Sequence, residues 1–232
     1  MKKFFREPLP GVVPGSLKGK LIVIEGPDCS GRTTQIELVS KWLELKGYAV
    51  VQTGLKRSLL VAEELETALQ GNVLSPRTLS LFYATDFYDQ LENTMIPALR
   101  AGLVVLADRY VYTLMARAVI RGSEPAWVES IYRMAVVPDM VLSLYVSPKV
   151  LVERTFQSHQ QLDYWESGMD MGLSRDWFTS FMKYQRRLRL EFKKMEEKFG
   201  FEVINANRTA RSIDRDLKAK IATILDGFDD KE

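Results

Sequence analysis

The apolar residues of the chain gather in five short runs, separated by longer segments with helical periodicity. The runs cover residues 21–25, 48–54, 103–108, 140–146 and 201–206. Most of them are apolar at consecutive rather than alternate positions, which predicts strands buried on both faces. Strands that alternate with helices in this way indicate crossover connections and a parallel sheet. The pattern therefore predicts an α/β fold, a three-layer sandwich with a five-stranded parallel sheet and helices on both of its faces.

The intervals between these runs carry the helical periodicity. Helices are predicted at residues 33–46, 59–70, 76–99, 111–121, 126–135, 150–157, 176–198 and 213–225. The third of them is expected to begin after Ser75, an N-cap residue, with Pro76 at its first position. Pro97 should bend or break this helix near its end, because proline lacks the backbone N–H that helical bonding needs.

Two segments fall outside this alternation. Residues 1–18 are rich in proline and glycine and form an N-terminal arm, expected to be poorly ordered or to pack against a partner subunit. Residues 19–232 are expected to form a single domain. Within it, residues 158–174 lack periodicity between two firm helices. A long irregular connection in a compact domain is typical of a functional loop, and we interpret this one as a lid.

Charge and composition limit the classes of function. Lys and Arg total 32 against 30 Asp and Glu, so no strong field favours nucleic acid as a partner. No apolar run is long enough to span a membrane, and the basic N-terminus lacks a signal-peptide core. Cys29 is the single cysteine and His159 the single histidine, which excludes an internal disulfide and most cysteine or histidine metal clusters. These features indicate a cytoplasmic protein that acts on small molecules.

A glycine-containing loop follows the first predicted strand and opens directly into a helix. It fits the pattern G-x-x-x-x-G-K-[ST], except that Arg32 replaces the lysine. Backbone N–H groups of such a loop, at the N-terminus of a helix, bind the phosphates of a nucleotide. Arg32 can reach the terminal phosphates, and the Thr33 hydroxyl can bind Mg²⁺. The nucleotide-binding residues are thus expected to be Gly26, Pro27, Asp28, Cys29, Ser30, Gly31, Arg32, Thr33 and Thr34.

The exchange of lysine for arginine in this loop is not conservative. Arginine is permanently charged and presents a planar fork of donors, whereas lysine is a compact point charge. We expect the loop with arginine still to bind phosphate. The exchange is expected to affect the alignment of the transferred phosphoryl group instead.

With these motifs in place, the chain resembles the thymidylate kinase family from about Lys20 to Ile224. The resemblance rests on LIVIEGPDCSGRTTQ, LFYATDFYDQLENTMIPALRAGLVVLADRY and PDMVLSLYVSPKVLVERTF, in that order. It implies a P-loop fold and transfer of the γ-phosphate of ATP, with Mg²⁺, to a nucleoside monophosphate. The reaction would be dTMP + ATP to dTDP + ADP, a step of nucleotide biosynthesis, catalysed by a homodimer.

The resemblance also implies roles for residues on the acceptor side. Asp28 would contact the sugar hydroxyl of the monophosphate, and Phe82 would stack on its base. Asp108 would support the metal and the loop, and Arg109 would grip the acceptor phosphate. Thr33 and Asp108 are accordingly the expected metal-side residues.

On the donor side, the resemblance places residues 205–208, with Arg208, against adenine. The lid at residues 158–174 would close over ATP. Members of the family supply an arginine to the transferred phosphoryl group from the loop or the lid. Because Cys29 occupies the loop position, Arg154 and Arg175, at the two ends of the lid, are the remaining candidates.

Several positions depart from the family pattern and bear on the acceptor. Residues 85–87 offer no arginine to read the base. A phosphate-binding arginine of the family is also missing after the second strand, which leaves Lys56 or Arg57 as candidate substitutes. Arg117 and the alanine after it replace a tyrosine and a glutamine near the base. Two alternatives therefore stay open: a kinase of a different small acceptor, and a non-catalytic nucleotide-binding protein. Arg32 and the altered lid favour the second of these.

Overall fold

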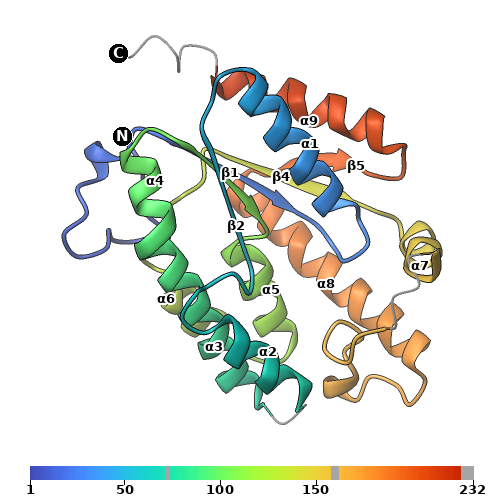
Figure 1. The fold of residues 1–232 in the computed structure, drawn as a ribbon. Helices are drawn as coiled ribbons and strands as arrows, with labels where there is room; N and C mark the ends of the chain where they lie inside the picture. The colour runs from blue at the N-terminus through green and yellow to red at the C-terminus, as the bar shows by residue number, and fades with distance from the viewer. Residues whose placement is uncertain (72–73, 158–161, 226–232) are drawn as a thin grey trace.

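The fold is described from a computed structural model, which covers residues 1–71, 74–157 and 162–225. One five-stranded sheet lies at its centre, with every neighbouring pair of strands parallel and the order β2-β3-β1-β4-β5 (Figure 1). This confirms the predicted five-stranded parallel sheet. The strands are β1 (Lys20–Glu25), β2 (Val50–Gly54), β3 (Val104–Asp108), β4 (Met140–Tyr145) and β5 (Glu202–Asn205).

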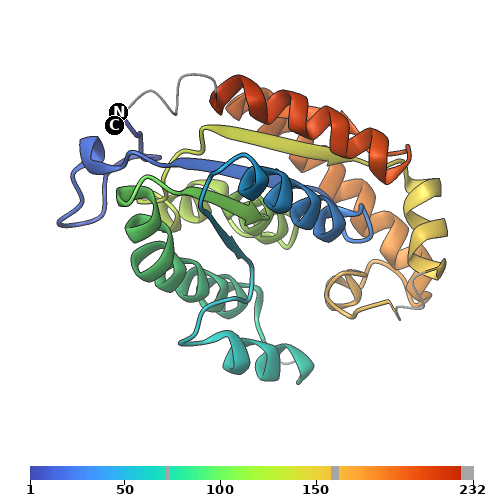
Figure 2. The same ribbon diagram turned by 45° about the horizontal axis from the view of Figure 1, so that its top comes forward.

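Helices cover both faces of the sheet, as Figure 2 shows. Successive side chains of β1 point to opposite faces, so Leu21 and Val23 join one apolar cluster and Ile22 and Ile24 join another. The first cluster packs against α3 (Pro76–Gln90), α5 (Val111–Ile120) and α8 (Trp177–Phe199). The second packs against α1 (Arg32–Leu45) and α9 (Ala210–Leu225). Burial on both sides explains why the strands are apolar at consecutive positions.

The predicted break in the third helix occurs as a change of helix type. After α3 the chain makes a π-helical turn over Leu91–Met95 and continues as α4 (Ile96–Arg100), whose second residue is Pro97. A wider turn accommodates the missing backbone donor of proline. The remaining helices are α2 (Ala62–Gln70), α6 (Pro125–Ile131), α7 (Pro148–Gln157) and short 3-10 turns at Pro14–Ser16 and Met169–Met171. Within the described ranges, none is long and apolar enough to cross a bilayer.

The N-terminal arm lies against the body of its own chain. Phe4 forms an antiparallel bridge with Val136, and Leu9 and Leu17 are buried in the cluster beneath α3 and α4. The backbone N–H of Gly19 donates to the Leu99 carbonyl and leads the chain into β1. These contacts give the arm a defined place within the chain.

The loops that follow β1, β3 and β5 meet at one edge of the sheet, because the carboxyl ends of parallel strands share that edge. This is where ligands bind in open parallel sheets. The loop after β1 comes from the centre of the sheet, with the ends of β3 and β4 on either side.

Candidate active site

The loop between β1 and α1 has the backbone shape that its sequence predicts. Gly31 has φ +91°, a left-handed conformation that suits glycine, and the helix begins at the next residue. Cys29 also has a positive φ, of 58°. The side chains of Thr33 and Thr34 are exposed at the first turn of the helix. The N-terminus of α1 therefore opens onto the ligand-binding edge.

Arg32 folds back into the loop. Its Nη1 donates to the carbonyls of Gly26 and Pro27 at 2.5 and 2.6 Å, and its Nε donates to Asp108 Oδ1 at 2.8 Å. The guanidinium is therefore nearly buried at the end of β3. Arg32 thus joins the start of the loop to the Asp108 carboxylate, and it lies beside the position where loop N–H groups would bind phosphate.

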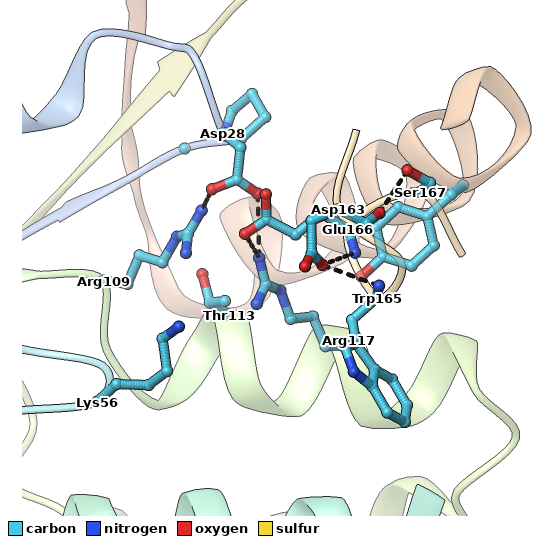
Figure 3. A network of polar contacts seen from close by, with 12 residues as sticks. Asp28, Lys56, Arg109, Thr113, Arg117, Asp163, Trp165, Glu166 and Ser167 are labelled. Carbon is cyan, nitrogen blue, oxygen red and sulfur yellow. Dashed lines mark hydrogen bonds and ion pairs between the residues drawn. The ribbon is translucent and has the colours of Figure 1, made fainter. Parts of the chain in front are cut away.

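Two further arginines share the carboxylate of Asp28, as Figure 3 shows. Arg109, directly after β3, pairs with one carboxylate oxygen of Asp28, and Arg117, on α5, reaches the other at 3.1 Å. Arg117 also lies 3.6 Å from Glu166, in the segment before α8. Both arginine side chains are nearly buried. The structure therefore gathers two cations and two carboxylates from four separate parts of the chain.

Neither arginine is fully satisfied by this arrangement. Among the residues that the structure describes, the buried Nε of Arg109 and that of Arg117 have no hydrogen-bond partner. Burial, and secondly the nearby positive charge of Arg117, lower the pKa of Arg109 to about 10. A phosphate placed here would accept hydrogen bonds from the two Nε atoms, and it would compete with Asp28 and Glu166 for the two guanidiniums.

Buried acidic residues hold the surrounding loops in place. Glu25, at the end of β1, accepts hydrogen bonds from the Tyr110 N–H at 2.9 Å and from the Thr113 hydroxyl at 2.6 Å. Its pKa is raised chiefly by burial, although these bonds oppose the shift. Asp86, on α3, accepts from the N–H of Lys56 and of Ser58, both at 2.9 Å. These carboxylates fix the start of α5 and the loop after β2.

A small cavity lies between α3 and α5, next to Arg117. Tyr83 from α3 and Trp165 line it, and its volume is about 20 Å³. Phe82, the residue expected to stack on the base, is not among its lining residues and packs instead against the core. On this face of α3 the aromatic residue directed at the cavity is thus Tyr83.

The two candidate cations after β2 take different partners. Lys56 pairs with Glu66 of α2 at 2.6 Å, with its side chain partly exposed. Arg57 lies 3.9 Å from Asp108 Oδ2, on the side of that carboxylate away from Arg32. Of the two, Arg57 is the one in direct contact with the Arg32–Asp108 pair.

On the donor side, Arg154 of α7 connects two loops. Its guanidinium donates to the Ser30 carbonyl at 3.1 Å and to the Ala206 carbonyl at 2.8 Å. Arg208 donates to the Asn205 carbonyl at 3.0 Å and pairs with Asp216. Arg154 therefore ties the phosphate loop to residues 205–208, so the two candidate parts of a nucleotide site are adjacent. Arg175, by contrast, is exposed just before α8.

The expected lid is described only in part. Residues 158–161, which include His159, lie outside the described residues, while residues 162–174 are described. Asp163 Oδ1 accepts from the N–H groups of Trp165 and Glu166, which makes a tight turn there. This turn places Glu166 beside Arg117. The described part of the expected lid therefore contacts a residue expected to bind the phosphate acceptor.

The residues expected to hold Mg²⁺ are oxygen donors at the right edge of the sheet. Thr33 exposes its hydroxyl at the first turn of α1, and Asp108 ends β3. In the described residues, no group of three or more His, Cys, Asp or Glu side chains could hold a metal by itself. A hydroxyl and one carboxylate fit Mg²⁺, which keeps several waters and binds largely through nucleotide phosphates.

Sequence reasoning missed three residues of this site. Tyr83 and Phe82 are neighbours on the same helix, and only the packing of α3 on α5 distinguishes them. Trp165 and Glu166 follow Asp163 in an irregular segment, where the only signal was an aromatic residue between carboxylates. Their contact with α5 depends on the path of the chain between α7 and α8, which periodicity does not reveal.

Known proteins are similar to this chain over most of its length. The family model for thymidylate kinase matches residues 24–217. A probable thymidylate kinase 2 of Saccharolobus solfataricus is 32% identical over 211 residues, which cover 90% of this chain and 99% of the relative. A probable thymidylate kinase of Thermococcus gammatolerans is 30% identical, over 86% and 94% of the two chains. The thymidylate kinase of Pelotomaculum thermopropionicum is 31% identical, over 91% and 97%. These similarities extend over nearly all of the sheet and the helices around it.

Proposed function

The chain belongs to the thymidylate kinase family, and on this premise we propose that it phosphorylates thymidylate at the cluster formed by Asp28, Arg109 and Arg117. The family makes it a nucleoside monophosphate kinase that uses ATP. The observation that supports the location is the pair of nearly buried guanidiniums that converge on one carboxylate beside the phosphate loop. Such a pair suits a phosphate dianion, because arginine binds phosphate oxygens with two parallel hydrogen bonds.

The donor is proposed to lie along the phosphate loop. Backbone N–H groups of residues 26–33, except Pro27, which has none, and the N-terminus of α1 would bind its phosphates. Arg32 would exchange its bonds to the Gly26 and Pro27 carbonyls for bonds to the terminal phosphates, which carry far more charge. Arg154 would support adenine binding by holding the loop against residues 205–208.

The acceptor is proposed to place its phosphate on Arg109 and Arg117. An oxygen of this phosphate attacks the γ-phosphorus of ATP, the bond from that phosphorus to the β–γ bridging oxygen breaks, and ADP leaves. No general base is needed, since the attacking oxygen is already anionic. The chain supplies positioning and charge neutralisation, which are the main requirements of phosphoryl transfer.

Mg²⁺ is proposed to bind with ATP, where it neutralises charge on the β- and γ-phosphates. The Thr33 hydroxyl and the Asp108 carboxylate would hold it. Asp108 also orients Arg32 through the 2.8 Å hydrogen bond, which aligns that guanidinium with the phosphates.

Residues 19–232 are proposed to act as one kinase domain, with residues 158–174 as its lid. Arg154, at the base of this lid, is the better placed of the two candidate arginines, because it already contacts the phosphate loop. Arg175 would need to move from its exposed position to reach a phosphate.

We also propose that the protein works in the cytoplasm as a homodimer. Large apolar side chains are exposed on the outer side of α3 and on the loop before α2, where Leu81, Leu59 and Leu60 are at least half exposed. Large exposed apolar side chains favour a protein partner, and a second copy is the simplest one. Light scattering coupled to size exclusion would give twice the mass of the chain.

The test of the activity is a coupled assay of ADP formation with a panel of acceptors. The purified chain, ATP and Mg²⁺ would be combined in turn with dTMP, other nucleoside monophosphates and other phosphorylated acceptors. Thymidylate should give the highest kcat/KM. Higher turnover of another acceptor would reject thymidylate as the substrate, and ATP binding without turnover of any acceptor would reject the kinase activity altogether.

A further inference from the structure

The residues that follow Asp163 fold into a compact element, here called the Trp165 segment (residues 163–172), which packs on α8. Gly168 has φ +64°, and a Cβ at this position would lie 2.7 Å from the Tyr184 ring. Ser180 Oγ donates to the Ser167 carbonyl at 2.8 Å, which joins the segment to the first turn of α8. Only glycine at position 168 permits this close approach.

Arg121, at the end of α5, holds the same segment from the other side. Its Nε and Nη2 donate to the two carboxylate oxygens of Asp170 at 2.8 and 3.2 Å. Nη2 also donates to the Trp165 carbonyl at 2.7 Å, and Nη1 donates to the Tyr184 hydroxyl at 3.1 Å. The guanidinium lies 5.2 Å from the centre of the Tyr184 ring, and the side chain is only 4% exposed. One buried arginine thus fixes both the backbone and a carboxylate of the segment.

The consequence of this attachment is the position of the Trp165 ring. Its Nε1 donates to the Leu69 carbonyl at the end of α2, at 2.9 Å, and the ring is 8% exposed. It forms one wall of the cavity that Tyr83 and Arg117 also line. That cavity, of about 20 Å³ counted as the space open to the centre of a water molecule, has room for about one water molecule, since roughly 10–15 Å³ on this measure is enough to hold one.

An acceptor base that extends from the Arg109 and Arg117 phosphate site toward α3 therefore meets this wall. A pyrimidine ring is larger than the single water molecule for which the cavity has room, so it can enter only as far as the lining side chains yield, the Trp165 ring among them. How far the ring yields depends on how firmly its backbone is held, and a purine demands a larger displacement than a pyrimidine. Arg121 lies outside the Asp28 cluster, but it lines this cavity and its guanidinium lies 6.0 Å from the centre of the Trp165 ring, so it is placed to affect the size of the acceptor.

We propose that Arg121 is a positioning residue for acceptor size: by holding Asp170 and the Trp165 carbonyl, it fixes the Trp165 ring as the wall that limits the acceptor base. The proposal rests on the proposed kinase function. It assigns to the Trp165 segment a role in choosing the acceptor rather than in covering ATP.

The test compares the wild type with Arg121→Met and Trp165→Ala in steady-state kinetics, with dTMP and dGMP as acceptors. Each variant should shift the ratio of kcat/KM for dGMP to that for dTMP by about tenfold toward the purine, a size expected for a change in pocket fit. The KM for ATP should stay within about twofold of the wild type. The double variant should shift the ratio no further than Trp165→Ala alone, because both changes act on one wall.

Three further variants distinguish a positioning role of Arg121 from a general loss of folded structure. Asp170→Asn keeps the shape of the segment but weakens the ion pair, so it should give part of the shift even if Arg121→Met folds poorly. Arg121→Lys should restore part of the wild-type ratio. Arg133→Met removes an arginine whose pair with Glu7 is half exposed at the surface, and it should leave the ratio unchanged.

Calorimetric titration of each protein with dTMP and with dGMP, without ATP, keeps the two proposals distinguishable. If no protein forms ADP but the ratio of dissociation constants shifts as described, the kinase function fails and the role of Arg121 stands. If ADP forms while both ratios stay constant across the variants, Arg121 has no such role and the kinase function stands. Additive effects in the double variant, or equal changes in the KM of acceptor and ATP, would also overturn the proposal.

Discussion

Arg32 and Asp108 are bonded directly to each other, with the guanidinium Nε donating to the carboxylate at 2.8 Å. The same guanidinium binds the first two carbonyls of the phosphate loop, so one side chain connects that loop to the end of β3. A lysine has a single ammonium group and could not make this planar set of contacts. The replacement found in this chain therefore changes how the loop is held as well as how it would meet a phosphate.

Replacing Arg32 tests its proposed contact with the polyphosphate. Arg32→Ala should lower kcat/KM for ATP by about a hundredfold or more, because a charge-assisted bond to the transferring group is lost. Arg32→Lys should retain most of the activity, since a point charge can still reach the phosphates. The coupled ADP assay measures both. Wild-type binding and turnover of ATP by Arg32→Ala would remove Arg32 from the donor site.

Asp28→Asn tests the charge balance of the cluster. With its carboxylate gone, the nearly buried Arg109 and Arg117 repel each other, and the free energy of unfolding should fall by about 2 kcal/mol. Urea denaturation measures this loss. Glu129→Gln, which removes a carboxylate from an exposed pair with Lys198, is the control and should leave stability unchanged. Equal losses in the two variants would show that Asp28 is no more than a surface partner.

Tyr83 and Phe82 are neighbours on α3, but only Tyr83 lines the cavity. Tyr83→Ala should raise the KM for thymidylate about tenfold, because the ring that faces the base is removed. Phe82→Ala should lower thermal stability through lost packing and leave the KM for thymidylate close to the wild-type value. Steady-state kinetics and thermal unfolding of both variants decide the matter. The reverse pattern would return the stacking role to Phe82.

The metal requirement can be tested with Thr33. Removal of Mg²⁺ with EDTA should stop ADP formation, and addition of Mg²⁺ should restore it. Thr33→Val should raise the Mg²⁺ concentration needed for half-maximal rate, because a ligand hydroxyl is replaced by a methyl group of similar shape. Thr223→Val, at an exposed position on α9 outside the site, is the matched control. Identical Mg²⁺ dependence in both variants would exclude Thr33 as a metal ligand.

Glu25 should give the stability of the protein a distinct pH dependence. Burial raises its pKa in the folded state above its ordinary value of 4.5. Between these two values the folded chain keeps a proton that the unfolded chain has released, so the folded state binds more protons. The free energy of unfolding therefore falls as pH rises through this window and levels off above the folded pKa.

Comparison with Glu25→Gln isolates this contribution. Urea denaturation of both proteins across mildly acidic to neutral pH gives the difference in their free energies of unfolding. As pH rises from 4.5, the wild type should lose stability relative to Glu25→Gln, and the difference between their free energies of unfolding should then become constant. Glu202→Gln, at an exposed pair with Lys220, should show no such trend. If the wild type instead gains stability relative to Glu25→Gln as pH rises, the hydrogen bonds from Tyr110 and Thr113 lower the pKa of Glu25 more than burial raises it.

The order and type of the elements were predictable because the local signals agree with the packing. β1 shows this: its run of apolar residues reflects burial between two helical layers, and Leu21 and Ile22 do enter opposite clusters. The α3 helix begins at Pro76 as expected, with Ser75 accepting a hydrogen bond from the Thr78 N–H. The sequence pattern did not specify the π-helical form of the break near Pro97, the early end of α6 at Ile131 or the packing of the N-terminal arm on its own chain.

The site was predictable where it lies at the end of a strand and not where it depends on tertiary packing. The loop after β1 and Asp108 and Arg109 after β3 follow from strand position alone. Which of Tyr83 and Phe82 faces the cavity depends on the rotation of α3 against α5, and either assignment fits an amphipathic helix. Arg121 carried no signal, because its partner Asp170 is 49 residues away in an irregular segment.

The sole cysteine of the chain has a practical consequence, since Cys29 stands in the turn between β1 and α1. Any reagent specific for thiols would attach at this one place, without the need to remove other cysteines by mutagenesis. Bound nucleotide should slow this labelling, because Cys29 stands in the loop that is expected to bind the phosphates. The rate at which Cys29 is labelled can therefore be used to measure nucleotide binding.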